Sequence, residues 1–228
     1  MPHAPGVTRK WIACVVLMLC TAACSGIGPD RKLAAIKTFL SGWAIVTPPW
    51  PYNWGMGTLA FGSGMAVAAG DRLRVSQEKP SYLELRDDRA LAVLGPDTQV
   101  VLEAASIYRS ITQTRLSMQQ GAVYAAVDGP LGKGYLDIRT PMGTASLDKT
   151  LGSSAMAVGI DTEAGIVRIA CIRGSVTVQA GRTSITLSPG TSIALARNGK
   201  EQRVQAFEGQ PPEIDPFLWQ VVVEHYEP

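Results

Sequence analysis

Histidine is scarce in this chain: its 228 residues include two, His3 and His225, and His225 lies close to the C-terminus, where chains fray. A Ser-His-Asp triad is therefore not expected, and the Gly-x-Ser-x-Gly motif of a serine nucleophile is absent. Charged residues make up only 18% of the chain, against 46% hydrophobic residues. Enough apolar surface exists to build a core, which excludes disorder over most of the length. We expect one domain with appendages and no enzymatic activity.

The N-terminus has the pattern of an export signal. Arg9 and Lys10 precede an uninterrupted apolar run at residues 11–23, which is shorter than the ~20 residues that a membrane span needs. This length suits the hydrophobic region of a signal peptide with small residues at its cleavage point. We therefore expect residues 1–23 to be removed on export.

Residues 21–24, Thr-Ala-Ala-Cys, resemble the lipobox of bacterial lipoproteins. The resemblance implies cleavage before Cys24 and acylation of that cysteine, so that the protein is extracytoplasmic and lipid-anchored to a bacterial cell membrane. Two or more acyl chains anchor a protein stably, whereas one is marginal. Ordinary signal-peptidase cleavage with an incidental Cys24 is the alternative.

Loss of the signal changes the charge and the cysteine count. The full chain has 21 basic and 19 acidic residues, so removing Arg9 and Lys10 leaves 19 of each and a net charge of zero. This argues against a nucleic-acid partner, which needs a basic surface. Cys24, Cys171 and one histidine are too few for a zinc site, and we expect neither a metal nor another cofactor. Cys171 lies in an apolar strand-like run, which predicts a buried, inert thiol.

Short runs of alternating apolar and polar residues dominate residues 59–207. The runs are rich in β-branched residues and are separated by turn signals such as Gly-Pro-Asp at 95–97 and Ser-Pro-Gly at 188–190. This pattern is typical of an all-β fold, either a β-roll, a solenoid or a sandwich of short strands. The alternation predicts ten inward-facing residues: Leu83, Leu85, Val100, Leu102, Val123, Ile138, Ile169, Val176, Val178 and Leu187.

Two helices are expected outside this region. Asp30 as N-cap and apolar residues at three- or four-residue spacing predict a short N-terminal helix over residues 30–43. Asp215 and Pro216 favour a C-terminal helix that starts beside them, although three following valines leave a strand as the alternative. The predicted organisation is a signal peptide at 1–23, a lipid-anchored arm at 24–58, the β domain at 59–207 and a tail at 208–228.

Residues 64–199 contain short landmarks in a fixed order. They are Gly-Asp at 70–71, Leu-x-Leu-x-Asp at 83–87, Pro-Asp-Thr at 96–98, a Gly-x-Val step at 121–123, Thr-Pro-x-Gly at 140–143 and Gly-x-Val-x-Val at 174–178. In order and spacing the series resembles a FecR-like domain. The resemblance implies an extracytoplasmic all-β roll or solenoid, and the best-known members are iron-uptake sensors with a cytoplasmic anti-sigma tail and a membrane span. Residues 1–10 are too short to fold as such a tail.

Other motifs have ordinary structural interpretations. Asp87-Asp88 and the Asp161–Glu163 stretch fall at turns, where aspartate is favoured by local hydrogen bonds, and calcium binding is the less favoured alternative. The glycine-rich stretch at 129–134 is predicted to be a hairpin loop. A phosphate loop would need a Ser or Thr after the lysine and a helix behind it.

Four large aromatic residues lie close together in a stretch rich in proline and glycine, and they are the candidate partner-binding residues: Trp43, Trp50, Tyr52 and Trp54. Exposed aromatic side chains form protein interfaces or, less favoured here, stack on sugar rings. The favoured alternative is that they cover an open edge of the β core.

The sequence thus predicts a non-catalytic envelope lipoprotein whose FecR-like domain binds or scaffolds another envelope protein. The alternative is a ligand-sensing component of an envelope signalling system that works through a separate transmembrane regulator. A third hypothesis, an envelope glycan hydrolase, would need a cleft with paired carboxylates.

Overall fold

In the computed structural model the chain divides into two compact units, Met1–Lys32 and Leu33–Pro228. The described residues all belong to the larger unit. Within it the structure describes residues 37–41, 44–47, 59–60, 67–78, 81–86, 89–108, 111–131, 133–147, 152–196, 203–211 and 214–226. Strands make up most of these residues, which confirms the predicted all-β class. The helix found among them spans ten residues, and no helix in these ranges is long and apolar enough to cross a membrane.

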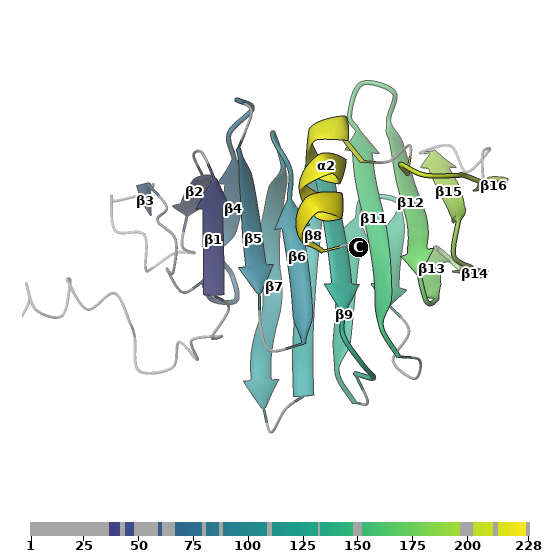
Figure 1. Ribbon diagram of the computed structural model, residues 1–228, viewed down its shortest axis with the longest axis horizontal. Coiled ribbons are helices and arrows are strands. Elements are labelled where there is room, and N and C mark those ends of the chain that lie inside the picture. The colour runs from purple at the N-terminus through teal and green to yellow at the C-terminus, as the bar shows by residue number, and fades with distance from the viewer. Residues whose placement is uncertain are drawn as a thin grey trace, which may run out of the picture. The chain divides into compact units, whose positions relative to one another are not determined.

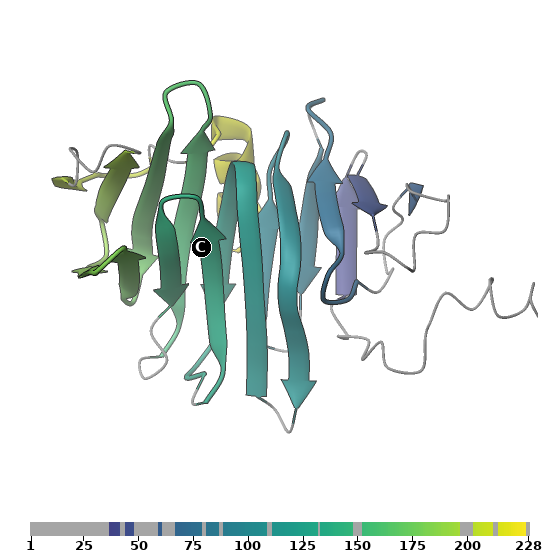
Figure 2. The same cartoon turned by 180° about the vertical axis from the view of Figure 1, so that it is seen from behind.

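The strands form two layers that share one long strand. Sheet A contains, in spatial order, β1 (Lys37–Ser41), β5 (Tyr82–Arg86), β6 (Ala90–Leu94), the second half of β8 (Ile111–Val127), β11 (Ser154–Asp161), β12 (Ile166–Arg173), β15 (Thr191–Ala196) and β16 (Arg203–Ala206). Sheet B contains β3 (Leu59–Ala60), β2 (Ala44–Thr47), β4 (Arg72–Val75), β7 (Gln99–Tyr108), the first half of β8, β9 (Tyr135–Thr140), β10 (Gly143–Leu147), β13 (Val176–Ala180) and β14 (Thr183–Leu187). Helix α2 (Pro216–His225) lies over sheet A, and the reverse view shows sheet B nearer the viewer (Figures 1 and 2).

Strand β8 passes from one sheet to the other at Gly121. Its first half pairs with β7 and β9, and its second half pairs with β6 and β11. Gly121 has φ +88°, and a Cβ there would lie 2.5 Å from Cα of Thr98. The Thr98 hydroxyl fastens the crossing, since it donates to the Ala122 carbonyl and accepts from the Ala122 amide, both at 3.0 Å. A residue without a side chain is therefore required at this point.

The main core lies between the two sheets. All ten residues that the alternation predicted to face inward are buried there, from Leu83 and Leu85 through Leu187. Met156 and Cys171 extend the same core, and both are fully buried. The period-two pattern thus identified the inner face correctly, because each strand has one face on this core.

The predicted N-terminal helix over residues 30–43 is wrong for the part that the structure describes. Residues 37–41 form β1, which pairs antiparallel with β5. An isolated helix of that length is marginal in water, whereas pairing with a sheet edge satisfies the backbone hydrogen bonds of this segment. Both β1 and β2 precede residue 59, where the β domain was predicted to begin.

The loop after β8 is also not a hairpin. Strand β9 pairs with the first half of β8 in parallel, with Gln113 opposite Tyr135. Because β8 has already moved into sheet A by Val127, the chain must cross back to sheet B before β9 can start. The glycine-rich stretch at 129–134 therefore belongs to a crossover between sheets, which requires a longer path than a hairpin turn.

Candidate partner-binding surface around helix α2

Helix α2 forms because its first turn is capped. The Asp215 carboxylate accepts a hydrogen bond from the Phe217 amide at 2.9 Å, and Pro216 occupies the first helical position. An N-cap of this kind stabilises a helix by ~1 kcal/mol, and proline at N1 loses no hydrogen bond. Two of the valines that favoured a strand, Val221 and Val222, are buried, so packing compensates for their lower helix propensity.

A stripe of alanines on the outer face of sheet A receives the helix. Leu218 and Val222 of α2, with Ile214 just before it, belong to a second apolar cluster. The sheet contributes small residues to this cluster: Ala122, Ala126, Ala155, Ala157 and Ala170. Small side chains let the helix axis approach the sheet closely, as the short distance of 3.0 Å from a Cβ built on Gly95 to Leu218 Cδ2 also indicates. The sequence alone predicted the helix but not the part of sheet A on which it packs.

Aromatic side chains gather around α2. Of the seven aromatic side chains that the structure describes, six belong to this group: Tyr82, Tyr124, Phe207, Phe217, Trp219 and Tyr226. Tyr82 contacts Phe217 and Tyr124 stacks on Tyr226, each with 6.5 Å between ring centroids. Five of the six are half-buried rather than enclosed. The surface therefore combines rigid apolar area with exposure.

A buried carboxylate ties the end of α2 to the sheet. Glu84 projects from the outer face of β5 and is only 5% exposed. The Tyr226 hydroxyl donates a hydrogen bond to Glu84 Oε2, and Arg86 Nε lies 2.9 Å from Glu84 Oε1. The Arg86 guanidinium also lies 5.6 Å from the centre of the Tyr226 ring. Burial, followed by the hydrogen bond to Glu84, raises the pKa of Tyr226 well above its ordinary value.

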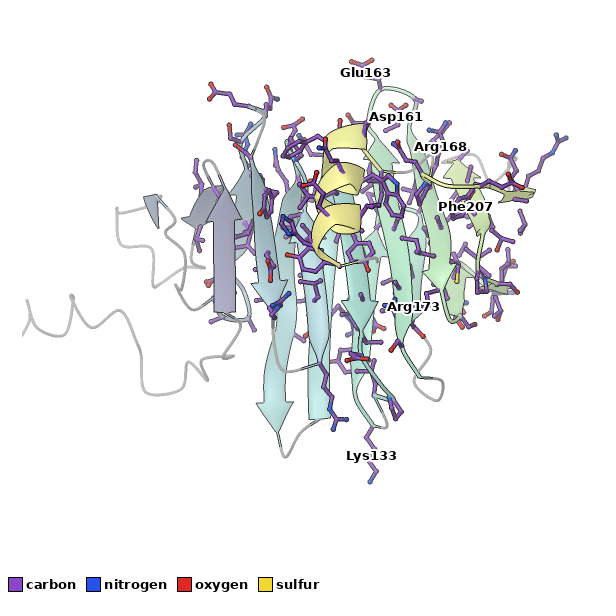
Figure 3. All side chains as sticks on the ribbon, viewed as in Figure 1. Lys133, Asp161, Glu163, Arg168, Arg173 and Phe207 are labelled. Carbon is purple, nitrogen blue, oxygen red and sulfur yellow. The ribbon has the colours of Figure 1, made fainter. Side chains whose placement is uncertain are left out.

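A groove opens beside this contact at the C-terminal end of α2. Its volume is about 490 Å³, and its walls include three arginines, Arg86, Arg89 and Arg173, with Tyr226 and His225 from the helix end. A smaller hollow of about 260 Å³ lies at the other end of the helix, between Asp161, Arg168 and Asp215. Figure 3 shows Asp161 and Arg168 toward the first turn of α2, and Arg173 toward its last turn.

These side chains are suited to recognition. Arginine and the large aromatic residues are the types that dominate the energy of protein interfaces. Within the described ranges, no three His, Cys, Asp or Glu residues are grouped as metal ligands would be. His225 is exposed at the helix end and contacts the Tyr226 ring.

The residues singled out by the sequence have different outcomes. Cys24 and the aromatic residues Trp43, Trp50, Tyr52 and Trp54 lie outside the described residues. Cys171 is buried as predicted, and burial raises its thiol pKa to about 11.

The Asp161 turn also follows its prediction. The Asp161 carboxylate accepts from the Ala164 amide at 2.8 Å, which is the local hydrogen bond expected of aspartate at a turn. The surface around α2 was missed, although four aromatic residues within the last 22 (Phe207, Phe217, Trp219 and Tyr226) could have indicated it.

Comparison with known proteins gives a limited likeness of fold. No protein-family model matches the sequence, and no curated protein matches it. Two crystal structures are similar, each of a "putative anti-sigma factor" from Parabacteroides distasonis ATCC 8503. The first has a TM-score of 0.47 and 12% identity, over 61% of this chain and 61% of that one. The second has a TM-score of 0.42 and 12% identity, over 62% of this chain and 58% of that one.

Proposed function

We propose that the protein is a non-catalytic binding module of the cell envelope, anchored through a lipid on Cys24, and that the surface around α2 receives a protein partner. The observation that carries the proposal is the grouping of six aromatic side chains around one helix, beside a groove with three arginines. The resemblance of the landmark series to a FecR-like domain and of residues 21–24 to a lipobox supports a location outside the cytoplasm.

The energetics of association favour this surface over the rest of the described unit. The outer face of sheet B carries mainly polar side chains, among them Arg115 beside Asp137 and Arg139 beside Glu103. Around α2, by contrast, half-buried rings offer area with few rotamers to lose on binding. Trp219 is the ring that we expect to contribute most, since tryptophan is enriched among interface residues of high energetic weight.

Site-specific photo-crosslinking in the native membrane tests the proposal. A photoreactive amino acid at Gln220 or Val223, both exposed on α2, should give one discrete crosslinked product. The same amino acid at Arg74, exposed on the outer face of sheet B, is the matched control. Trp219→Ala should remove the product from α2 while the protein stays folded by circular dichroism. Equal products at α2 and at Arg74, or none at α2, would contradict the proposal.

The identity of the crosslinked protein also separates the two functional hypotheses. A transmembrane regulator would make the protein a sensing component of envelope signalling, working through that partner. Another envelope protein without a regulatory domain would favour scaffolding. Turnover of cell-wall glycans by the purified protein would instead show that the non-catalytic assignment is wrong.

The anchor is tested independently of the binding surface. Intact mass of the mature protein should correspond to a chain that starts at an acylated Cys24. Cys24→Ala should release the protein from membranes or stall its processing. A mature species that retains Trp11, or carries an unmodified Cys24, would contradict the lipid anchor.

A further inference from the structure

The two sheets end at the same end of the described unit. Strand β14 is the last strand of sheet B and pairs with β13. Strand β16 is the last strand of sheet A and pairs with β15. Both views show these terminal strands together, on the side away from β1 (Figures 1 and 2). Among the described residues, no strand pairs with the outer side of β14 or of β16, so each leaves one row of backbone N–H and C=O groups without a partner strand.

Within the described ranges, apolar side chains of the core are exposed at this end. Val204 of β16 stands opposite Ile193, a core residue that is 1% exposed, so its side chain is on the inner face. Val204 is nevertheless 52% exposed. On β14, Ile185 stands opposite the fully buried Val178 and packs on the core, yet it too is only partly buried. Inward-facing apolar side chains at both terminal strands thus lack cover from the residues that the structure describes.

Strand β14 also lacks the features that protect an edge strand. Its sequence, Thr-Ser-Ile-Thr-Leu, contains no charge and no proline, and its pairing with β13 is continuous without a bulge. Proteins that must keep an edge strand single place lysine, proline, a bulge or an inward charge there. An uncharged edge rich in β-branched residues instead favours pairing with another strand.

We propose that β14 pairs antiparallel with β14 of a second copy of this chain, about a two-fold axis that passes through Ile185. This register is self-complementary. Ile185 meets Ile185 of the second copy on the inner face, and Ser184 meets Thr186 across the strands on the outer face, where hydroxyl pairs are favourable. No like charges are brought opposite each other within the paired strands. A two-fold interface of this kind closes on itself and does not propagate into a fibre.

Disulfide trapping in the native membrane tests the register. In antiparallel strands, directly opposite residues have Cα atoms ~4.5–5.5 Å apart, within the range that a disulfide bridges. Ile185→Cys should therefore give a covalent dimer on mild oxidation. Thr177→Cys, one strand further in on β13, is the matched control and should stay monomeric. A dimer at neither position, or an equal yield at both, would overturn the proposal.

A charge exchange tests the same contact without a disulfide. The purified full chain should sediment as a dimer, and Ile185→Lys and Ile185→Glu should each weaken the dimer by roughly 100-fold, because like charges then meet at the axis. A mixture of the two variants should form the heterodimer, which shows at the same time that both variants fold. A wild-type chain that is monomeric at ~100 µM, a hundredfold above the ~1 µM dissociation constant of a moderate dimer, would overturn the proposal. So would a mixture that does not associate.

Discussion

Removal of one hydroxyl, in Tyr226→Phe, should measurably loosen the C-terminal helix. The hydroxyl donates to a carboxylate on Glu84 that is 5% exposed, and a hydrogen bond to a charged group contributes ~1.5–3 kcal/mol. For a chain of this size, 1 kcal/mol corresponds to ~2–4 °C in melting temperature, so we expect a loss of about 3–12 °C. Thermal unfolding followed by circular dichroism measures it. Tyr82→Phe is the control, since no hydrogen bond of the Tyr82 hydroxyl is found among the described residues, and its loss should stay under ~0.5 kcal/mol.

The pH dependence of folding stability tests the same contact independently. Burial raises the pKa of Tyr226 in the folded protein, above the value of about 10 that applies to an unfolded tyrosine. As pH rises past that value, the unfolded chain loses the proton while the folded chain retains it, so stability falls. The Tyr226→Phe variant should lack this part of the alkaline loss. A variant as stable as wild type at pH 7, with an unchanged alkaline profile, would refute the reasoning.

Three further predictions concern the core and the crossing. Leu102→Ala should cost ~2–5 kcal/mol because Leu102 is fully buried, whereas Val101→Ala on the outer face should cost under ~1 kcal/mol in the same denaturant titration. Gly121→Ala should prevent folding or cost ~3 kcal/mol or more, since its Cβ would meet Thr98. Gly129→Ala, with positive φ but open space around it, should cost only ~1–2 kcal/mol. The Cys171 thiol, with its pKa raised to about 11, should resist alkylation at pH 8 until the protein unfolds, as mass spectrometry of that peptide would show.

The inner face of the fold could be predicted because it depends on local alternation. Leu83 and Leu85, or Val176 and Val178, are two residues apart on strands with one face on the core, and their burial follows from that spacing. Residues 37–41 were predicted incorrectly because apolar residues at helical spacing over so short a segment do not distinguish a helix from an edge strand. Pairing with β5 decided between them, and that pairing spans more than 40 residues of sequence.

The surface around α2 could not be predicted for a related reason. Glu84 and Tyr226, its central contact, are separated by 142 residues. The alanines beneath the helix come from three strands, β8, β11 and β12. Within each strand their spacing indicates only that they lie on the outer face, not that a helix covers them. A single sequence shows the helix cap at Asp215 but not which strands the helix will cover. The helix could be located from the residues next to it, whereas the candidate site depends on contacts between residues far apart in the sequence.

The proposed dimer and the proposed partner surface are compatible, and their geometry has a consequence for binding. An axis through Ile185 perpendicular to the sheets continues sheet A of one copy beside sheet A of the other, so both copies present α2 on the same side. The helix lies over β6, β8, β11 and β12, two strands or more from the edge at β16, so pairing leaves it uncovered. Two identical surfaces on one side favour a partner that is itself dimeric or repeated, because the second contact then forms at high effective concentration.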